Sequence, residues 1–435
     1  MTISSNSEQV SVQPALLPFG ADERAALQRR TLRVLTVGQV VGAAALASAI
    51  TVGGFVIEDM VGVGTSWVGI STAAVTVGSG AMSQVLSRVM RTRGRRVGMQ
   101  LGYGLAVIGG VVACLGVQTS ALPVFLIGLL FYGAGSSTNL LARYAATDLA
   151  EPQARSRAMS RILFASTFGA ILGPTLIGPA ESAGESWFGL HKYAGPWLFS
   201  SFFFFCAMIN VALRLRPDPL LVSAMSYETA DDARRVRFID SARAILSSPI
   251  ARLALMAMVI SQAVMVGVMA MTPIDMKSHG HEQVSSYVVS MHIAGMFAFS
   301  PLVGIYADRR GRVAALRVGG LVLLVADVLS ALAMDNVALM FVAMWALGFG
   351  WSLGLIGGSS LLIDSIPLSH RVAVQGAADL TMSVCGGLAG VAYGFIMNAV
   401  GFQLLAVISA CATVLILYGA FRSTHDVTAT ATATA

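Results

Sequence analysis

The sequence has little charge for its length. Only 11% of its 435 residues are Asp, Glu, Lys or Arg, whereas a soluble domain carries about 25%. Hydrophobic residues make up 56% of the chain, and the mean hydropathy is +0.75. This composition excludes an ordinary soluble protein and predicts a polytopic membrane protein whose surroundings are a lipid bilayer.

Lysine is almost absent. The two lysines, Lys192 and Lys277, fall on predicted outer loops. The other 26 of the 28 basic residues are arginines, and all of them fall on segments or helix ends at the inner side of the predicted membrane. Positively charged residues favour the cytoplasmic side of a membrane, so both termini are predicted to be cytoplasmic. This placement explains the net charge of +6, and no nucleic-acid partner is expected.

Cysteine is scarce as well. The four cysteines lie inside apolar runs, where they behave as small apolar side chains and form no disulfide framework or metal site. The chain has no phosphate-binding loop and no nucleophile–base set, so we expect no enzyme activity, no metal, no cofactor and no use of ATP. The first thirty residues are polar and the first apolar run is long enough to span, so no cleavable signal peptide is predicted.

Long apolar runs fill most of the chain. Each has roughly the 20 residues that a helix needs to cross a hydrocarbon core of about 30 Å. The predicted spans are 34–56, 66–89, 97–117, 122–147, 158–179, 196–215, 250–274, 285–307, 313–334, 337–363, 372–400 and 401–421. They divide the chain into a cytoplasmic tail (1–32), a six-helix bundle (33–215), a cytoplasmic linker (216–249), a second six-helix bundle (250–421) and a disordered tail (422–435).

The two halves repeat each other. Four landmarks recur at an offset that stays nearly constant, which indicates two parallel repeats related about the membrane normal. The pairs are Gly94-Arg95 with Gly311-Arg312, Gly133-Ala-Gly135 with Gly348-Phe-Gly350, Asp148 with Asp364, and Arg157 with Arg371.

An arginine-rich turn separates two runs in the second half: Gly304-Ile-Tyr-Ala-Asp308-Arg309-Arg310-Gly311-Arg312. The pattern Gly-x-x-x-Asp-Arg-x-Gly-Arg in this place resembles the loop motif of the major facilitator superfamily. That resemblance implies an all-α membrane fold, with twelve transmembrane helices in two six-helix repeats and both termini cytoplasmic. It also implies transport of small molecules.

The resemblance assigns gating roles to the motif. It implies that Asp308 contacts the amino end of a helix in the other repeat, where free N–H groups and the helix dipole favour an acid. It implies that Arg312 contacts Asp364, with Gly304, Arg309 and Gly311 completing the motif. The first-half copy is degenerate: Ser87 stands at the glycine position and Arg91 at the aspartate position, which leaves Arg95 with Asp148 as the remaining pair.

The fifth run contains Gly169, Gly173, Pro174 and Gly178. Small residues at this spacing let helices approach closely, and proline permits a bend. The pattern resembles the fifth-helix motif of the drug:proton antiporters, with Ile177 replacing one glycine. Ordinary helix packing is the alternative interpretation.

Polar residues inside the runs are candidates for binding substrate or protons. Asn139 and Arg143 share a helix face, and Arg143 either faces a cavity or extends toward the membrane surface. His292 is a titratable candidate with Asp275 as a partner, although a packing hydrogen bond or a metal contact would also explain it. His279 and His281 are predicted to be solvent-exposed.

Gln262 and Trp351 complete the candidates. Met271-Thr-Pro273, the His292-x-x-Gly-Met-Phe297 pattern, Gly350-Trp351 and the stretch from Val374 to Asp379 resemble an efflux-like bacterial branch of the superfamily. The sequence offers no account of Asp327, an acid in the middle of the ninth run.

These features predict a monomeric exporter of small, largely apolar organic molecules in a bacterial cytoplasmic membrane. The proton gradient would supply the energy, and the two halves would rock about a central site. The alternatives are an importer of a vitamin or another small metabolite and, in a different class, a membrane sensor that transports nothing.

Overall fold

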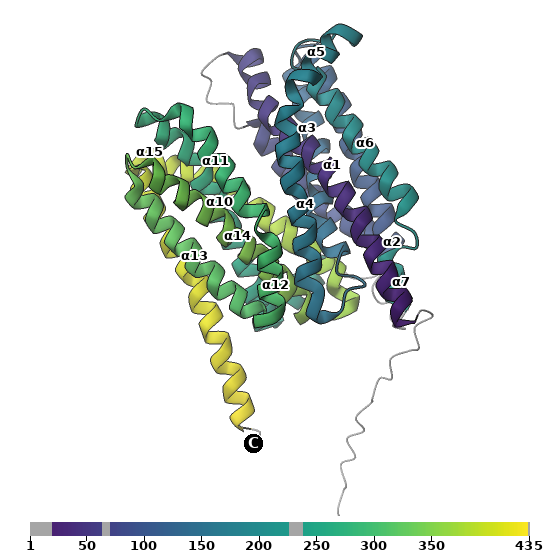
Figure 1. The fold of residues 1–435 in the computed structure, drawn as a ribbon, viewed down its shortest axis with the longest axis vertical. Helices are drawn as coiled ribbons and strands as arrows, with labels where there is room; N and C mark the ends of the chain where they lie inside the picture. The colour runs from purple at the N-terminus through teal and green to yellow at the C-terminus, as the bar shows by residue number, and fades with distance from the viewer. Residues whose placement is uncertain (1–19, 63–69, 226–237, 434–435) are drawn as a thin grey trace, which may run out of the picture.

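The computed structural model describes residues 20–62, 70–225 and 238–433, which are almost entirely helical and contain no strand. The helices form two bundles side by side (Figure 1). The first contains α1 (Ala21–Val61), α2 (Ile70–Gln118), α3 (Leu122–Ala145), a 3₁₀ turn (Pro152–Ala154), α4 (Arg155–Thr175), α5 (Ile177–Phe188) and α6 (Gly195–Arg214). The second contains α10 (Pro249–Ser278), α11 (Glu282–Phe297), α12 (Ser300–Arg310), α13 (Arg312–Ala333), α14 (Val337–Ser365) and α15 (Leu368–Ala433). Each bundle has its own apolar core.

Nine helices in the described part of the chain are long and apolar enough to cross a membrane, or ten if α4 and α5 count as one bent span. The chain is therefore a multi-pass membrane protein, as the composition predicts. Two of these helices are unusually long. Gly94 in α2 (φ 88°) and Gly401 in α15 (φ 81°) have left-handed backbone conformations that kink the helix. Glycine adopts such a conformation without steric cost, so the chain turns there without a loop.

Two predicted spans are interrupted. The run 158–179 was expected to be one helix, but α4 ends at Thr175 and α5 begins at Ile177 with a bend of 49°. Pro174 causes the break, because it lacks an N–H group and its ring crowds the preceding turn. The run 285–307 divides into α11 and α12, and Pro301 stands in the first turn of the second helix.

The predicted C-terminal tail and linker contain more helix than expected. In the N-terminal tail the sequence favours a short amphipathic helix over 22–33, and the structure joins this helix to the first span in α1, which begins at Ala21. Arg24 and Gln28 anchor its start through hydrogen bonds to the carbonyls of Leu149 (3.2 Å) and Ala146 (2.7 Å). The tail 422–435 was predicted to be disordered, but α15 continues to Ala433. Its alternating alanines are strong helix formers. The linker contains α7 (Pro219–Met225) and α9 (Phe238–Ser247).

Candidate functional site

Asp308 joins the two bundles. It lies in the last turn of α12, and its carboxylate accepts hydrogen bonds from the backbone N–H groups of Ser156 (3.1 Å) and Arg157 (2.9 Å) at the start of α4. It also pairs with Arg312 Nη1 at 2.9 Å. A Cβ at Gly304 would lie 2.7 Å from Ser160 Cβ and 2.8 Å from the Ser156 carbonyl oxygen, so a glycine there lets α12 approach α4. The structure thus places Asp308 at the amino end of a helix in the other repeat.

Asp364 is shared by arginines of both bundles. At the end of α14, its Oδ2 lies 3.2 Å from Arg312 Nε, and its Oδ1 lies 2.5 Å from Arg155 Nη1 of α4. Gly311 (φ 97°) makes the turn that brings Arg312 to this position. Arg309 is exposed and forms no ion pair with a described residue, so this member of the motif makes no bridge here.

Arg95 forms the corresponding contact in the first half. It is fully buried and binds Asp148 with two hydrogen bonds of 2.8 and 3.1 Å. Its Nη2 also donates to Gln375 Oε1 of α15 at 2.9 Å, which links α2 to the other bundle. Burial raises the pKa of the Asp148 carboxyl, against the opposing effect of Arg95. Gln375 is not among the site residues that the sequence predicts.

Arg143 forms the most deeply buried bridge between the bundles. Its Nη2 lies 2.5 Å from Asp379 Oδ1 of α15, and the two side chains are 0% and 1% exposed. Arg143 Nε also donates to Ser359 Oγ of α14 at 3.2 Å, and Nη2 donates to the Tyr144 hydroxyl at 3.1 Å. The alternative that Arg143 extends toward the membrane surface is therefore wrong.

Asp379 forms this buried bridge but is not among the site residues that the sequence predicts. It is a lone acid inside a predicted apolar run, and this rarity is the signal that could have identified it. Its partner could not be read from the sequence, because Arg143 lies in the other half of the chain.

His292 and Asp275 are not paired. His292 is fully buried, with Nδ1 3.0 Å from the Met344 carbonyl oxygen and Nε2 without a hydrogen-bond partner among the described residues. Asp275 Oδ1 instead lies 3.7 Å from His279 Nδ1. The structure thus supports a packing hydrogen bond for His292, and its partnership with Asp275 is wrong. His279 and His281 are both partly exposed.

His279 has its own acidic partners at the end of α10. Its Nδ1 lies 2.8 Å from the Asp275 carbonyl oxygen, and its Nε2 lies 3.9 Å from Asp335 Oδ1. The hydrogen bond to the Asp275 backbone, together with the two carboxylates, raises the pKa of His279 above its usual value.

The other polar candidates form hydrogen bonds within single bundles, although the buried Asn139 Nδ2 has no partner among the described residues. The Tyr103 hydroxyl donates to Asn139 Oδ1 at 3.0 Å, between α2 and α3. Trp351 Nε1 donates to Gln262 Oε1 at 2.8 Å, between α14 and α10. Asn139 lies one turn from Arg143 on α3, but neither pair forms a hydrogen bond with Arg143, so the two pairs stand as separate candidates for contact with a substrate.

The fifth-helix motif packs α4 against α1. A Cβ at Gly169 would lie 2.5 Å from the Val40 carbonyl oxygen, and one at Gly173 would lie 2.6 Å from that of Ala44. Gly178 lies beyond the break, in α5, and has no such neighbour. Two of the three glycines therefore serve close packing.

Asp327 is fully buried, and Thr413 donates to its Oδ2 at 3.0 Å. This acid is therefore hydrogen-bonded inside its own bundle. Within the described part of the chain, no three His, Cys, Asp or Glu side chains lie close enough together to hold a metal ion.

The sequence matches the Major Facilitator Superfamily over residues 35–284 and 253–433, which together cover most of the chain. The chain belongs to this superfamily. It is similar to the MFS-type transporter YddS of Bacillus subtilis, with 33% identity over 96% of this chain and 97% of the relative. It is also similar to the riboflavin transporter RfnT of Brucella anthropi, with 28% identity over 87% of this chain and 91% of the relative.

A solved transporter structure has a similar fold. The human organic anion transporter MFSD10 superposes with a TM-score of 0.73 at 17% identity, over 90% of this chain and 99% of that one. At this identity the likeness shows the fold alone. The superfamily match identifies the protein as a multi-pass membrane transporter, and the bridges above join the two halves of its superfamily fold.

Proposed function

We propose that the protein is a proton-coupled exporter of small, largely apolar organic molecules in a bacterial cytoplasmic membrane, acting as a monomer. The ten candidate spans give twelve crossings if α2 and α15, each kinked at a glycine, cross twice. Twelve is an even number, so both termini would lie on one side of the membrane, and the distribution of the arginines makes that side the cytoplasm. The proton gradient is the proposed energy source.

The observation that carries this proposal is the buried bridge between Arg143 and Asp379. Each partner belongs to a different bundle, and neither is accessible to solvent. In so dry a site, removing one charge leaves the other uncompensated, at a cost of about 3–5 kcal/mol. Protonation of Asp379 would therefore weaken the contact between the bundles.

This bridge would connect proton binding to the direction in which the protein opens. Asp308 and Asp364 contact arginines at the start of α4, and Asp148 precedes Leu149, whose carbonyl oxygen accepts a hydrogen bond from Arg24 near the start of α1. These acids thus lie toward one end of the molecule. If this end is cytoplasmic, the deprotonated protein is closed to the cytoplasm. A proton that arrives from outside would neutralise Asp379 and favour opening inward, and its release would restore the closed state. His292 is the second candidate for a proton site.

Export is proposed from the fifth-helix motif. Gly169, Gly173 and Pro174 follow the pattern that resembles the drug:proton antiporters, and the two glycines hold α4 close to α1. The Arg143–Asp379 bridge alone would serve transport in either direction.

A second candidate function is import of a vitamin. It is favoured by the similarity to the riboflavin transporter RfnT, which extends over 87% of this chain. In this case the substrate would be riboflavin or a compound of similar chemistry, and the same bridge would operate in proton symport.

The test is transport in liposomes that contain a pH-sensitive dye, under an imposed proton gradient, with a panel of apolar compounds and riboflavin. Wild type is compared with Asp379→Asn, His292→Gln and Asp327→Asn. Asp327→Asn is a matched control, because Asp327 is an equally buried acid without a partner in the other bundle.

We expect substrate and protons to move in opposite directions in wild type and in Asp327→Asn. Asp379→Asn is expected to abolish the coupled proton movement. Movement in the same direction would establish the importer instead. Transport without any proton movement would refute proton coupling for the exporter and for the importer. Loss of coupling in His292→Gln but not in Asp379→Asn would assign the proton site to His292 of α11.

A further inference from the structure

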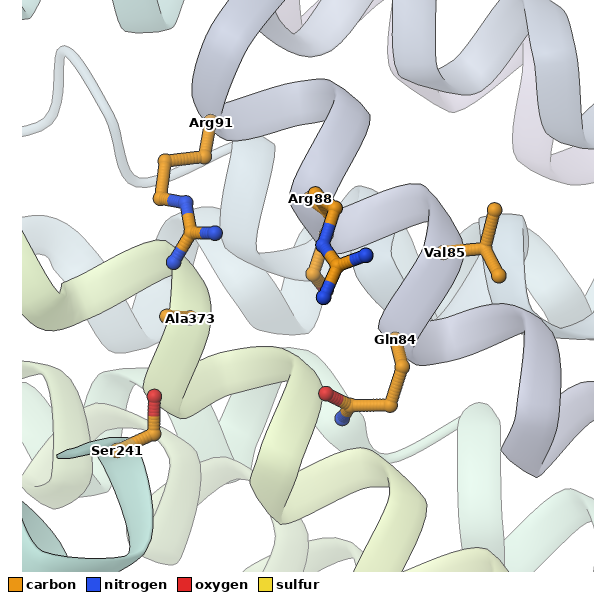
Figure 2. A pocket seen from close by; sticks show the side chains of 7 residues that line it. Gln84, Val85, Arg88, Arg91, Ser241 and Ala373 are labelled. Carbon is orange, nitrogen blue, oxygen red and sulfur yellow. The ribbon is translucent and has the colours of Figure 1, made fainter. Parts of the chain in front are cut away.

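The short helix α9 has a wider apolar face than its own bundle covers. It packs against α15 and α10 of the second bundle, and its Ser241 and Ile245 side chains are buried there. Figure 2 shows Ser241 next to Ala373, which lies near the start of α15. Because α15 begins three residues after α14 ends, α9 lies at the end of the second bundle that also holds Asp364.

Two large apolar side chains of α9 lie outside this contact. Ile239 is 56% exposed and Leu246 is 65% exposed. They are seven residues apart, which is close to two full turns, so they share one face of the helix. Arg243 and Ser247 are exposed beside this face. An apolar stripe with an arginine at its edge is typical of a helix that lies in the interface of a membrane.

The helix is joined directly to a membrane span. A single residue, Ser248, separates the end of α9 from Pro249, the first residue of α10. The Ser248 side chain accepts a hydrogen bond from the Ala251 N–H group at 3.2 Å and so caps α10. The backbone of Ser248 is extended, so the chain changes direction between the two helices. This junction holds α9 at the point where α10 begins.

The length of α10 indicates the depth of the junction. Its 30 residues extend about 45 Å at a rise of about 1.5 Å per residue, and a bilayer is about 40–45 Å thick with its headgroup layers included. The first turn of α10 therefore lies in a headgroup layer, and Ile250 in this turn is 41% exposed. The apolar face of α9 thus continues the surface that the span presents to lipid.

We propose that α9 is a membrane-surface anchor, with Ile239 and Leu246 inserted among the lipid acyl chains. The occupant of the exposed face is the phospholipid bilayer that surrounds the spans. Because α9 packs against α10 and α15, it fixes the depth of the second bundle in the membrane. Neither the substrate nor the direction of transport affects this anchoring.

The depth of the face can be measured with spin labels on the full-length protein in nanodiscs of phosphatidylcholine and phosphatidylglycerol. With the four native cysteines replaced by alanine, one label is attached to Ile239→Cys, Leu246→Cys or Ser247→Cys. Ser247→Cys is the matched control, because Ser247 is exposed next to Leu246 but outside the apolar stripe. Oxygen concentrates in the acyl chains and a nickel chelate stays in water, so the ratio of their collision rates with the label gives its depth.

We expect the labels at Ile239→Cys and Leu246→Cys to lie about 5–10 Å below the lipid phosphates. The label at Ser247→Cys is expected at the level of the phosphates or above it. Leu246→Glu should move the label at Ile239→Cys toward water by about 5 Å or more, whereas Ser247→Glu should not move it.

Two results would overturn the anchor. If the nickel chelate reaches the labels at Ile239→Cys and Leu246→Cys as readily as the label at Ser247→Cys, the face lies in water. If neither oxygen nor the chelate reaches them, protein covers the face, either the chain between α7 and α9 or a second copy of this chain. All three labelled positions are exposed, so the variants are expected to fold.

Discussion

The Arg143–Asp379 bridge makes a quantitative prediction for Asp379→Asn. The substitution preserves the shape of the side chain but leaves the fully buried Arg143 without a counter-charge. The closed arrangement should lose about 3–5 kcal/mol relative to one in which Arg143 reaches water. At about 1.4 kcal/mol per factor of ten, the open population rises about a hundred- to a few-thousand-fold.

Labelling of an introduced cysteine measures this change. Ser360 of α14 is fully buried, and its hydroxyl accepts a hydrogen bond from Ser156 of α4 at 3.0 Å, so it reports on the contact between the bundles. With the four native cysteines replaced by alanine, Ser360→Cys should react with a maleimide only when the bundles separate. We expect Asp379→Asn to accelerate the labelling reaction, by at most the increase of about a hundred- to a few-thousand-fold in the open population.

Two further variants make the experiment decisive. Asp327→Asn removes an acid whose hydrogen bond lies within one bundle, so it should not change the labelling rate. The double variant Arg143→Gln/Asp379→Asn removes both charges and should label more slowly than Asp379→Asn alone, because no uncompensated charge is buried. If Asp379→Asn labels at the wild-type rate, the bridge does not hold the bundles together and the reasoning is refuted.

Three further predictions concern other contacts. Asp308→Asn replaces a carboxylate that accepts hydrogen bonds from two backbone N–H groups of α4. Loss of its charge should weaken the contact between α12 and α4 by about 1.5–3 kcal/mol and accelerate the labelling of Ser360→Cys. An unchanged labelling rate would contradict this. Gly173→Leu should prevent close packing of α4 on α1 and reduce the yield of folded protein, whereas Gly178→Leu should not, as size-exclusion chromatography of both variants will show. The pKa of His279 is raised in the folded protein, so its contacts stabilise the fold fully below the unfolded pKa of about 6.5 and lose that effect as the pH rises through the folded pKa. The melting temperatures of wild type and His279→Gln should therefore differ most at acidic pH. A difference that stays constant with pH would contradict this.

Composition and local patterns determined the membrane character of the protein and part of its charged interface. Low charge and long apolar runs require helices in a bilayer, because a buried backbone must satisfy its own hydrogen bonds. The motif that ends at Arg312 predicted contacts for Asp308 and Asp364, and the structure contains both. These contacts are what the resemblance to the superfamily motif implies, since the spacing of the motif alone does not say which distant helix its side chains reach.

The tertiary structure alone decided which buried groups meet. Arg143 and Asp379 are 236 residues apart in sequence, and Arg95 contacts Gln375 across a similar distance. Helical periodicity places residues on a common face but does not determine which face meets which helix of the other bundle. For the same reason the sequence paired Asp275 with the wrong histidine. Only the packing of α2 against α15 brings Arg88 and Arg91 beside Ala373 at one pocket (Figure 2).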